Sequence, residues 1–369
     1  MDQDTLFDVA STSKAWTVML AAQAIDEGLL TWDGPIRDVI PEFQMTDEYA
    51  AAHLSVRDLA SHRSGLPGHD FLREKIFGDR ENLMRKLKDL EFSCGFRSKY
   101  QYNNHLFILL GYLVERARGG MLWEDQIVKY IAEPLGVDPI RFRGVKADMT
   151  NIHPALPYCS DGYQAQRCGY ATNYHSAPCG GIRISMKNMA KWIAAMSRGG
   201  VTESGARLCS EEQYKNIIAP VIPAPEEDCF WLKNSSYAQG WINADYKGTN
   251  VVFHSGGLTG FNPQVGFLPG QDCGYVMCFN TGTTPAHQVS RAIVLDALTA
   301  GQPEDSYDNM IDAWLQRRDR MRQKVLANAE GVPVTRESHP QLMGTYRHPA
   351  YEEFTIDEQE GRLRFHYGD

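Results

Sequence analysis

Apolar residues recur at helical spacing along much of the first two thirds of the chain. The stretches that carry this pattern, each expected to form a helix, are 13–27, 55–60, 71–90, 106–115, 123–131 and 186–197. In 106–115 the apolar residues lie on nearly every side, which predicts a buried helix. Gly28 follows the first stretch, as glycine commonly follows a helix.

The pattern changes to short alternating runs after residue 231. The runs expected to form consecutive antiparallel strands are 237–242, 250–254, 264–268 and 274–280, with turns at 246–248 and 269–272. Residues 285–300 follow as a helix that can cover such a sheet. We therefore expect an α/β protein of the α+β type, in which an antiparallel sheet is flanked by helices and joined to a mostly helical lobe.

The last part of the chain has its own pattern. Residues 309–327 predict a charged amphipathic helix, and alternating positions from 342 to 367 predict short strands. We expect a main domain over 1–300, a helical linker over 301–335 and a partial β-rich segment over 336–369. One or two strands are unstable alone, so this segment is expected to dock on the main domain or to begin a longer β region.

Composition argues against several function classes. The 369 residues carry a formal net charge of −9, which disfavours nucleic acid or an anionic membrane as the main partner. No apolar run approaches the roughly 20 residues of a membrane span. The start Met1-Asp2-Gln3-Asp4 shows no signal peptide, so we expect a cytoplasmic protein. Metal, dinucleotide, P-loop and Gly-x-Ser-x-Gly motifs are absent from the sequence, so we expect no metal, no cofactor and no α/β-hydrolase.

Residues 144–179 show no clear period and form a long predicted loop, a feature that is usually functional or disordered. Its tyrosines either line a substrate pocket or pack the loop against the body, and both interpretations stay open: Tyr158, Tyr163, Tyr170 and Tyr174. The eight cysteines form no C-x-x-C pair, so reduced thiols are expected. A disulfide within the crowded set of this loop stays open: Cys159, Cys168 and Cys179.

Ser11 and Lys14 stand three residues apart at the start of the first predicted helix, so their side chains share one face. A serine hydroxyl becomes a good nucleophile when a neighbouring base takes its proton. A lysine can be that base when burial or nearby positive potential, such as a helix start, lowers its pKa. Ser11 is the only serine in the sequence with a lysine three residues later. The alternative is a helix-capping serine beside a solvated lysine.

Two further segments accompany this pair: Tyr102-Asn103-Asn104, on a loop just before the helix 106–115, and His254-Ser255-Gly256-Gly257, at the end of a predicted strand. The three segments in this order resemble the serine β-lactamase and penicillin-binding-protein superfamily, specifically its class C-like branch with esterases, D-aminopeptidases and acyltransferases. The resemblance covers about residues 4–300 and implies a β-lactamase/transpeptidase-like fold.

The resemblance also implies a role for each residue. Ser11 would be the acylated nucleophile, while Lys14 and Tyr102 would share the proton transfers, with either as the general base. The backbone N–H groups of Ser11 and Gly257 would form the oxyanion hole. The side chain of Asn104 would bond Lys14 or the substrate amide. The implied substrate-binding residues are Asn104, His254, Ser255, Gly256 and Tyr170.

His254 departs from the pattern, since many members of the superfamily carry lysine there. Histidine is mostly neutral at pH 7, which favours less charged ester or amide substrates over carboxylate-bearing ones. A satisfied core histidine is the alternative at this position. Asp58, His62 and Ser64 lie too close together in sequence for a Ser-His-Asp triad, and we expect a capped helix and a tight turn there instead.

The first hypothesis is therefore a serine hydrolase or acyltransferase that acts through an acyl-enzyme on Ser11, with a small ester, amide or peptide substrate. Relatives carry several dozen residues before the nucleophile, so the first strands of the family sheet are expected to be missing from 1–300. A non-catalytic scaffold of the same fold is accordingly the second hypothesis. A β-lactamase or D-amino-acid peptidase is the third, and the sequence predicts no oligomeric state.

Overall fold

The computed structural model describes residues 1–70, 72, 79–143, 153–160, 164–171, 176–224, 232–282, 284–299, 307–329 and 335–367. Its helices are α1 (Lys14–Asp26), α2 (Glu48–His53), α3 (Val56–Ala60), α5 (Arg80–Lys86), α6 (Asn104–Ala117), α7 (Trp123–Ile127), α8 (Glu133–Leu135), α9 (Ala177–Gly180), α10 (Met186–Ser197), α11 (Glu211–Ile218), α12 (Pro285–Thr299) and α13 (Tyr307–Ala329). Its strands are β1 (Leu6–Asp8), β2 (Ile140–Phe142), β3 (Tyr158–Ser160), β4 (Ala165–Arg167), β5 (Ile182–Ser185), β6 (Ile222–Pro223), β7 (Leu232–Tyr237), β8 (Ile242–Tyr246), β9 (Thr249–Ser255), β10 (Asn262–Leu268), β11 (Cys273–Phe279), β12 (Gly344–His348), β13 (Glu352–Gln359) and β14 (Arg362–His366).

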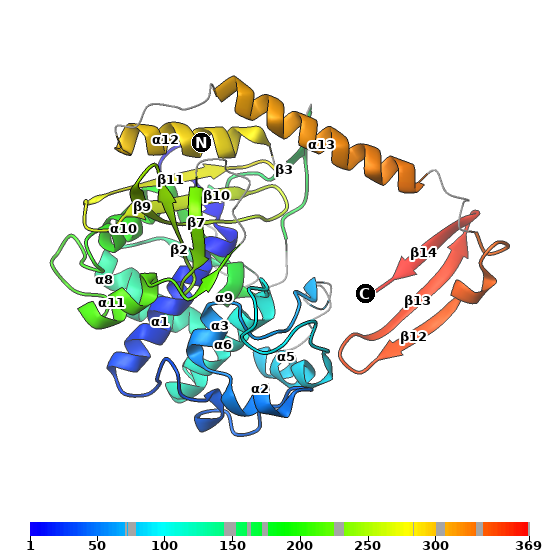
Figure 1. Ribbon diagram of the computed structural model, residues 1–369, viewed down its shortest axis with the longest axis horizontal. Coiled ribbons are helices and arrows are strands. Elements are labelled where there is room, and N and C mark those ends of the chain that lie inside the picture. The colour runs from blue at the N-terminus through cyan, green and yellow to red at the C-terminus, as the bar shows by residue number, and fades with distance from the viewer. Residues whose placement is uncertain are drawn as a thin grey trace.

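The main sheet is antiparallel and has the strand order β11-β10-β9-β8-β7-β6. Helices α10 and α12 both pack on β10 and β11, and Figure 1 shows α12 lying across this end of the sheet. Most of the other helices gather around α1 and α6 as a helical lobe, which shares one hydrophobic core with the sheet (Figure 1). The expected fold class, an antiparallel sheet flanked by helices with a helical lobe, is confirmed.

Helices α1 and α6 pack against each other in the centre of the molecule. All residues of α1 are buried except Gln23, Ile25 and Asp26, so hydrophobic burial on every side holds this helix in place. The predicted buried helix 106–115 is confirmed in α6, which begins earlier than expected because Asn103 caps it. Asn104, expected on the preceding loop, is therefore the first residue of the helix.

The strand predicted over 237–242 is wrong. Tyr237 and Ile242 pair across a tight turn between β7 and β8, in which the Ala238 N–H donates to the Trp241 carbonyl at 2.8 Å. Gly240 takes the positive φ of 69° that this turn requires. The apolar residues inside the turn are buried and therefore resemble a strand in the sequence pattern. The turns predicted at 246–248 and 269–272 are confirmed by the strand boundaries on either side.

A second, small sheet with the order β1-β5-β2 is absent from the sequence prediction. Its central strand, β5, comes directly before α10. Within 144–179, the described residues form β3, β4 and α9, and Cys159, Cys168 and Cys179 are free thiols. Tyr163 and Tyr174 lie outside the described residues, as does part of the helix predicted over 71–90.

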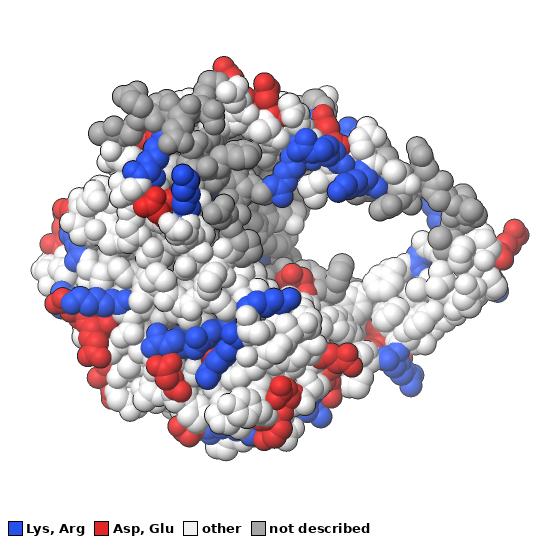
Figure 2. All heavy atoms as spheres, viewed as in Figure 1, with Lys and Arg blue, Asp and Glu red and all other residues white. Residues whose placement is uncertain are grey.

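The end of the chain forms α13 and a three-stranded antiparallel sheet, β12–β14, which we call the C-terminal sheet. Figure 1 shows α13 extending from the region of α12 towards this sheet, whose β12–β13 end approaches α5. Arg and Lys side chains gather along α13, and the surface is open between α13 and the main body (Figure 2). The division at 300 and 335 stays a prediction.

Candidate active site

Ser11 lies at the turn between β1 and α1. Ala10, directly before it, has a φ of 42°, a left-handed conformation that is unusual for a residue with a side chain. Residues Ala10–Ser13 then form a 3₁₀ turn that runs into α1. Ser11 is half-buried at this corner, while Lys14 is fully buried in the first turn of α1.

The ammonium nitrogen of Lys14 has three hydrogen-bond acceptors around it. Nζ lies 3.1 Å from Oγ of Ser11, 2.8 Å from Oδ1 of Asn104 and 2.7 Å from the carbonyl oxygen of Cys179. The Cys179 carbonyl comes from α9, an element that sequence reasoning missed. These three acceptors are enough for the three protons of a lysine ammonium, and they stabilise its charge in a buried position.

Tyr102 lies beside the same amine, on the segment that enters α6. The Nζ of Lys14 lies 4.8 Å from the centre of the Tyr102 ring, whose centre is in turn 6.5 Å from that of His254. The structure therefore brings together the three predicted segments, one from each of α1, α6 and β9.

The Gly256 backbone packs directly against Ala10 and Ser11, at the start of the 3₁₀ turn that leads into α1. A Cβ built on Gly256 would lie 3.1 Å from the Ser11 backbone nitrogen and 2.7 Å from Cγ of Pro263. Gly257, by contrast, is exposed, and a Cβ there would meet no protein atom within 4 Å. Glycine is thus required for close packing at 256, whereas 257 borders open space next to the site.

His254 is buried, with both ring nitrogens engaged. Its Nδ1 lies 2.6 Å from the Ser255 carbonyl oxygen, so Nδ1 carries a proton. Its Nε2 lies 2.9 Å from the hydroxyl of Tyr237 and accepts from it in the neutral ring. A substrate contact through His254 stays a prediction. These bonds agree with the alternative, a core histidine whose ring nitrogens are both hydrogen-bonded within the protein. Sequence reasoning missed Tyr237, because strand pairing alone brings it here.

His62 lies behind Tyr102, against the rings of Tyr102, Phe107 and Tyr237. Its Nδ1 accepts from the Asn103 N–H at 3.1 Å. Burial, and next the positive charge of Lys14, lower the pKa of His62 well below its usual range. This histidine is therefore neutral at pH 7.

Asp58, His62 and Ser64 form no triad, as expected. The Asp58 carboxylate accepts from Ser55, Arg63 and Arg97, and Asp58 completes the capping box at the start of α3. The Oγ of Ser64 accepts from the Leu66 N–H at 3.1 Å.

Tyr170 lies in a small cluster apart from Lys14. Its hydroxyl donates to the Ala155 carbonyl at 2.9 Å, and its ring stacks on Phe261 with centres 6.4 Å apart. Arg183 lies over the ring of Tyr170, 5.2 Å from its centre. These contacts pack the loop against the body, and a substrate-binding role for Tyr170 stays a prediction.

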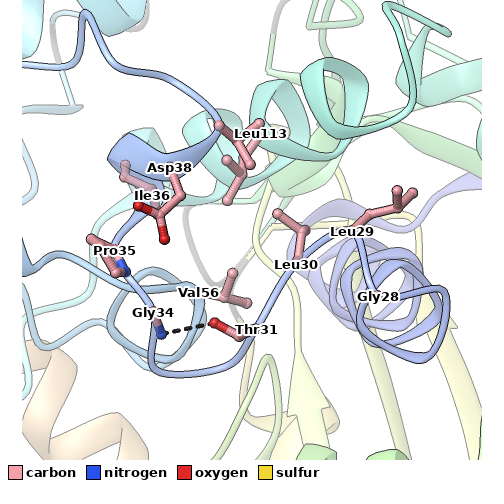
Figure 3. Close-up of a pocket in the computed structure, with 11 residues that line it drawn as sticks. Gly28, Leu29, Leu30, Thr31, Gly34, Pro35, Ile36, Asp38, Val56 and Leu113 are labelled. Atoms are coloured by element: carbon pink, nitrogen blue, oxygen red, sulfur yellow. Dashed lines mark hydrogen bonds between the residues drawn. The ribbon is translucent and has the colours of Figure 1, made fainter.

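The described residues hold neither a metal-ligand cluster nor a membrane-spanning helix. Within that part of the chain, no group of three or more His, Cys, Asp or Glu side chains could hold a metal ion. None of the helices described there is long and apolar enough to cross a membrane. A cavity of about 90 Å³ lies among Gly28, Leu30, Val56 and Leu113 (Figure 3). Because it adjoins the C-terminal end of α1, it is remote from Ser11 at the opposite end.

Comparisons with known proteins give matches along nearly the whole chain. The Beta-lactamase family model matches residues 1–299. The chain is 26% identical to unguisins hydrolase ungD′ of Aspergillus campestris (strain IBT 28561), over 98% of this chain and 70% of that protein. The octameric penicillin-binding protein homologue from Pyrococcus abyssi superimposes with a TM-score of 0.70 at 19% identity, over 98% of this chain and 76% of that one. The D-amino acid amidase from Ochrobactrum anthropi SV3 superimposes with a TM-score of 0.63 at 19% identity, over 81% of this chain and 94% of that one.

Proposed function

The chain belongs to the beta-lactamase family, and from this premise we propose that it is a serine hydrolase that forms an acyl-enzyme on Ser11 with ester or amide substrates. The observation that carries this proposal is the contact between Nζ of Lys14 and Oγ of Ser11, 3.1 Å long, inside a buried polar cluster. A nucleophile and its base need this hydrogen-bond reach before any proton can move.

The two other bonds of Lys14 support its assignment as the base. A neutral amine has two N–H donors and one lone pair. The fixed acceptors, Oδ1 of Asn104 and the carbonyl of Cys179, would take both donors. The lone pair would then be directed at the hydroxyl of Ser11. The same cluster thus accommodates both protonation states of Lys14, which a proton carrier requires.

The proposed reaction follows from this arrangement. The Ser11 hydroxyl proton passes to Lys14 while Oγ bonds to the substrate carbonyl carbon. The backbone N–H groups of Ser11 and Gly257 would stabilise the resulting oxyanion. Tyr102, beside the same amine, would give its proton to the leaving alcohol or amine and regain one from the Lys14 ammonium, which restores the neutral lysine. Water or another acyl acceptor then releases the acyl group from Ser11.

Small amides of low charge are the proposed substrate class. His254 stands where many superfamily members carry lysine, and it is bonded to Tyr237 and to the Ser255 carbonyl. A histidine with its ordinary pKa is mostly neutral at pH 7. A fixed positive charge for a substrate carboxylate is therefore lacking at this residue. Two of the similar proteins are named as a hydrolase and as a D-amino acid amidase, and the second name supports hydrolysis of amides.

The test is covalent labelling of the folded protein. A fluorophosphonate probe should add one adduct to the wild-type chain by intact mass, and peptide mapping should place it on Ser11. Ser11→Ala should abolish the adduct. Ser98→Ala is the matched control and should retain it, because the Ser98 hydroxyl is exposed and bonds the Gly95 carbonyl.

The same preparation should hydrolyse a D-amino acid p-nitroanilide or a p-nitrophenyl ester. Lys14→Met should lower the acylation rate by about 10³-fold or more, since it removes the base and leaves its fixed acceptors without a donor. A folded wild-type protein that takes no adduct and turns over no ester, amide or β-lactam would instead indicate a non-catalytic scaffold. Fast nitrocefin hydrolysis would favour a β-lactamase.

A further inference from the structure

Three consecutive side chains at the start of α6 hold one loop, residues 67–70, which we call the Pro67–Asp70 loop. The Nδ2 of Asn103 donates to the Pro67 carbonyl at 2.7 Å. The Nε2 of His105 donates to the His69 carbonyl at 3.0 Å. Between them, the Nδ2 of Asn104 donates to Oδ1 of Asp70 at 3.1 Å. This loop is thus attached to the residues that surround Lys14.

The bond to Asp70 has a consequence for Asn104. A side-chain amide has a donor end and an acceptor end, and nothing in the amide itself decides which faces which partner. An ionised carboxylate can only accept, so Asp70 attracts the Nδ2 end. The Oδ1 end is left facing Lys14, where it accepts at 2.8 Å.

The C-terminal sheet reaches the same loop from outside. The hydroxyl of Tyr351 lies 2.7 Å from Nδ1 of His69, the neighbour of Asp70, and the two rings are 5.9 Å apart between centres. Burial lowers the pKa of His69, and the neutral ring and the Tyr351 hydroxyl share one hydrogen bond. Ala350 is fully buried in the main core, and Glu352 pairs with Lys86 of α5. The C-terminal sheet is therefore docked at this position by apolar and polar contacts.

We propose that Asp70 is a positioning residue, which orients the Asn104 amide so that its oxygen faces Lys14, and that Tyr351 steadies the loop that carries Asp70. The inference rests on the proposed function, because it assigns Asp70 and Tyr351 a part in preparing Lys14 for proton transfer. It makes the C-terminal sheet, remote from Ser11 in sequence, a support of the acylation site.

The first experiment is a double-mutant cycle on the full chain, read as the rate of acylation by a p-nitrophenyl ester. Asp70→Ala should slow acylation about tenfold, as expected for loss of one charge-assisted hydrogen bond. In an Asn104→Ala background the same change should have little effect, because no amide remains to be oriented. Asp70→Asn should recover most of the rate, since its side-chain oxygen can still accept from Nδ2.

The pH profile separates positioning from a general loss of structure. With Asn104 free to turn its donor end towards Lys14, the ammonium form loses an acceptor and the lysine pKa falls. The acid limb of the acylation rate should therefore move to lower pH in Asp70→Ala, while the maximum falls. A variant that is merely less folded would lose rate at every pH and most at low pH, where the fold is least stable, which is the opposite of the expected shift of the acid limb.

The second experiment tests the C-terminal sheet. Tyr351→Phe removes only the hydroxyl that bonds His69, and should slow acylation about threefold and speed hydrogen exchange in residues 66–70. Tyr346→Phe is the matched control, because its hydroxyl bonds the Leu342 carbonyl at 2.9 Å within the C-terminal region. It should leave both measurements unchanged.

The outcomes separate the two proposals. Equal acylation of wild type, Asp70→Ala and Tyr351→Phe would overturn this inference and leave Ser11 as the nucleophile. Effects of Asp70→Ala that simply add to those of Asn104→Ala would overturn it as well. Absence of acylation in the wild-type protein would overturn the proposed function and this inference with it.

Discussion

The hydroxyl of Tyr237 lies 2.9 Å from Nε2 of His254, and both side chains are buried. The phenol donates and the imidazole accepts, while the second ring nitrogen is held by the Ser255 carbonyl. A histidine bonded at both nitrogens has one tautomer and one ring orientation. The end of β9, from which Gly256 and Gly257 continue, is therefore fixed from within the sheet.

Removal of that hydroxyl should destabilise the protein. Tyr237→Phe leaves the buried Nε2 without its donor, which costs about 1–3 kcal/mol of unfolding free energy. Urea denaturation monitored by tryptophan fluorescence measures this change. Tyr49→Phe is the comparison, because Tyr49 is 63% exposed and its substitution should change stability by less than about 0.5 kcal/mol. Equal stability of Tyr237→Phe and wild type would contradict a structural role for the bond.

Gly256 and Gly257 should respond differently to alanine. At 256 the new methyl group would press on Pro263 and on the backbone nitrogen of Ser11, so Gly256→Ala should cost about 1–3 kcal/mol and slow acylation. At 257 the methyl group meets open space, so Gly257→Ala should leave the melting temperature unchanged. Calorimetry of both variants tests the contrast, and an equal loss of stability would refute it.

Because of His62, the free energy of unfolding should decrease as the pH is lowered. Its pKa is depressed in the folded protein, so below pH ~6.5 the unfolded chain binds a proton that the folded chain does not. The wild-type protein should lose stability with a slope approaching about 1.4 kcal/mol per pH unit from this group alone as the pH falls towards 5.

The variant His62→Asn isolates this contribution. Asparagine tolerates the positive φ of 58° at this position and has an oxygen that can accept a hydrogen bond, but it does not titrate. It should be less stable than wild type at pH 8, and the difference should shrink as the pH falls from 6.5 to 5. A difference that stays constant over this range would contradict the burial of a neutral histidine.

The cysteines should react in order of exposure. Cys159 is exposed, whereas Cys209 is buried and its pKa is raised by burial to about 12. Since the thiolate is the reactive form, iodoacetamide at pH 8 should label Cys159 long before Cys209 in the native protein. Mass mapping over time follows both sites. Labelling of Cys209 as early as Cys159 would indicate that the fold around Cys209 opens readily.

The contact between Ser11 and Lys14 could be predicted from the sequence because the two residues share one helical turn, and the helical period alone sets their separation. The approach of Tyr102 and of the strand end at His254 came from the resemblance, since no local pattern carries a contact between segments so distant. The Cys179 carbonyl, Tyr237 and Asp70 had no signal at all. Each reaches the site through packing or strand register, and a backbone carbonyl has no identity in a sequence. The turn at 238–241 was hidden by its own buried apolar residues.

The attachment of the Pro67–Asp70 loop also sets a limit on how this region tolerates changes of length. Surface loops usually accept an inserted or deleted residue at little cost. A single insertion between Tyr102 and His105 would rotate the start of α6. The three side chains at 103–105 would then no longer face their hydrogen-bond partners on the loop. Loop grafting or library design in this protein is therefore best directed elsewhere, with this short segment kept at its native length.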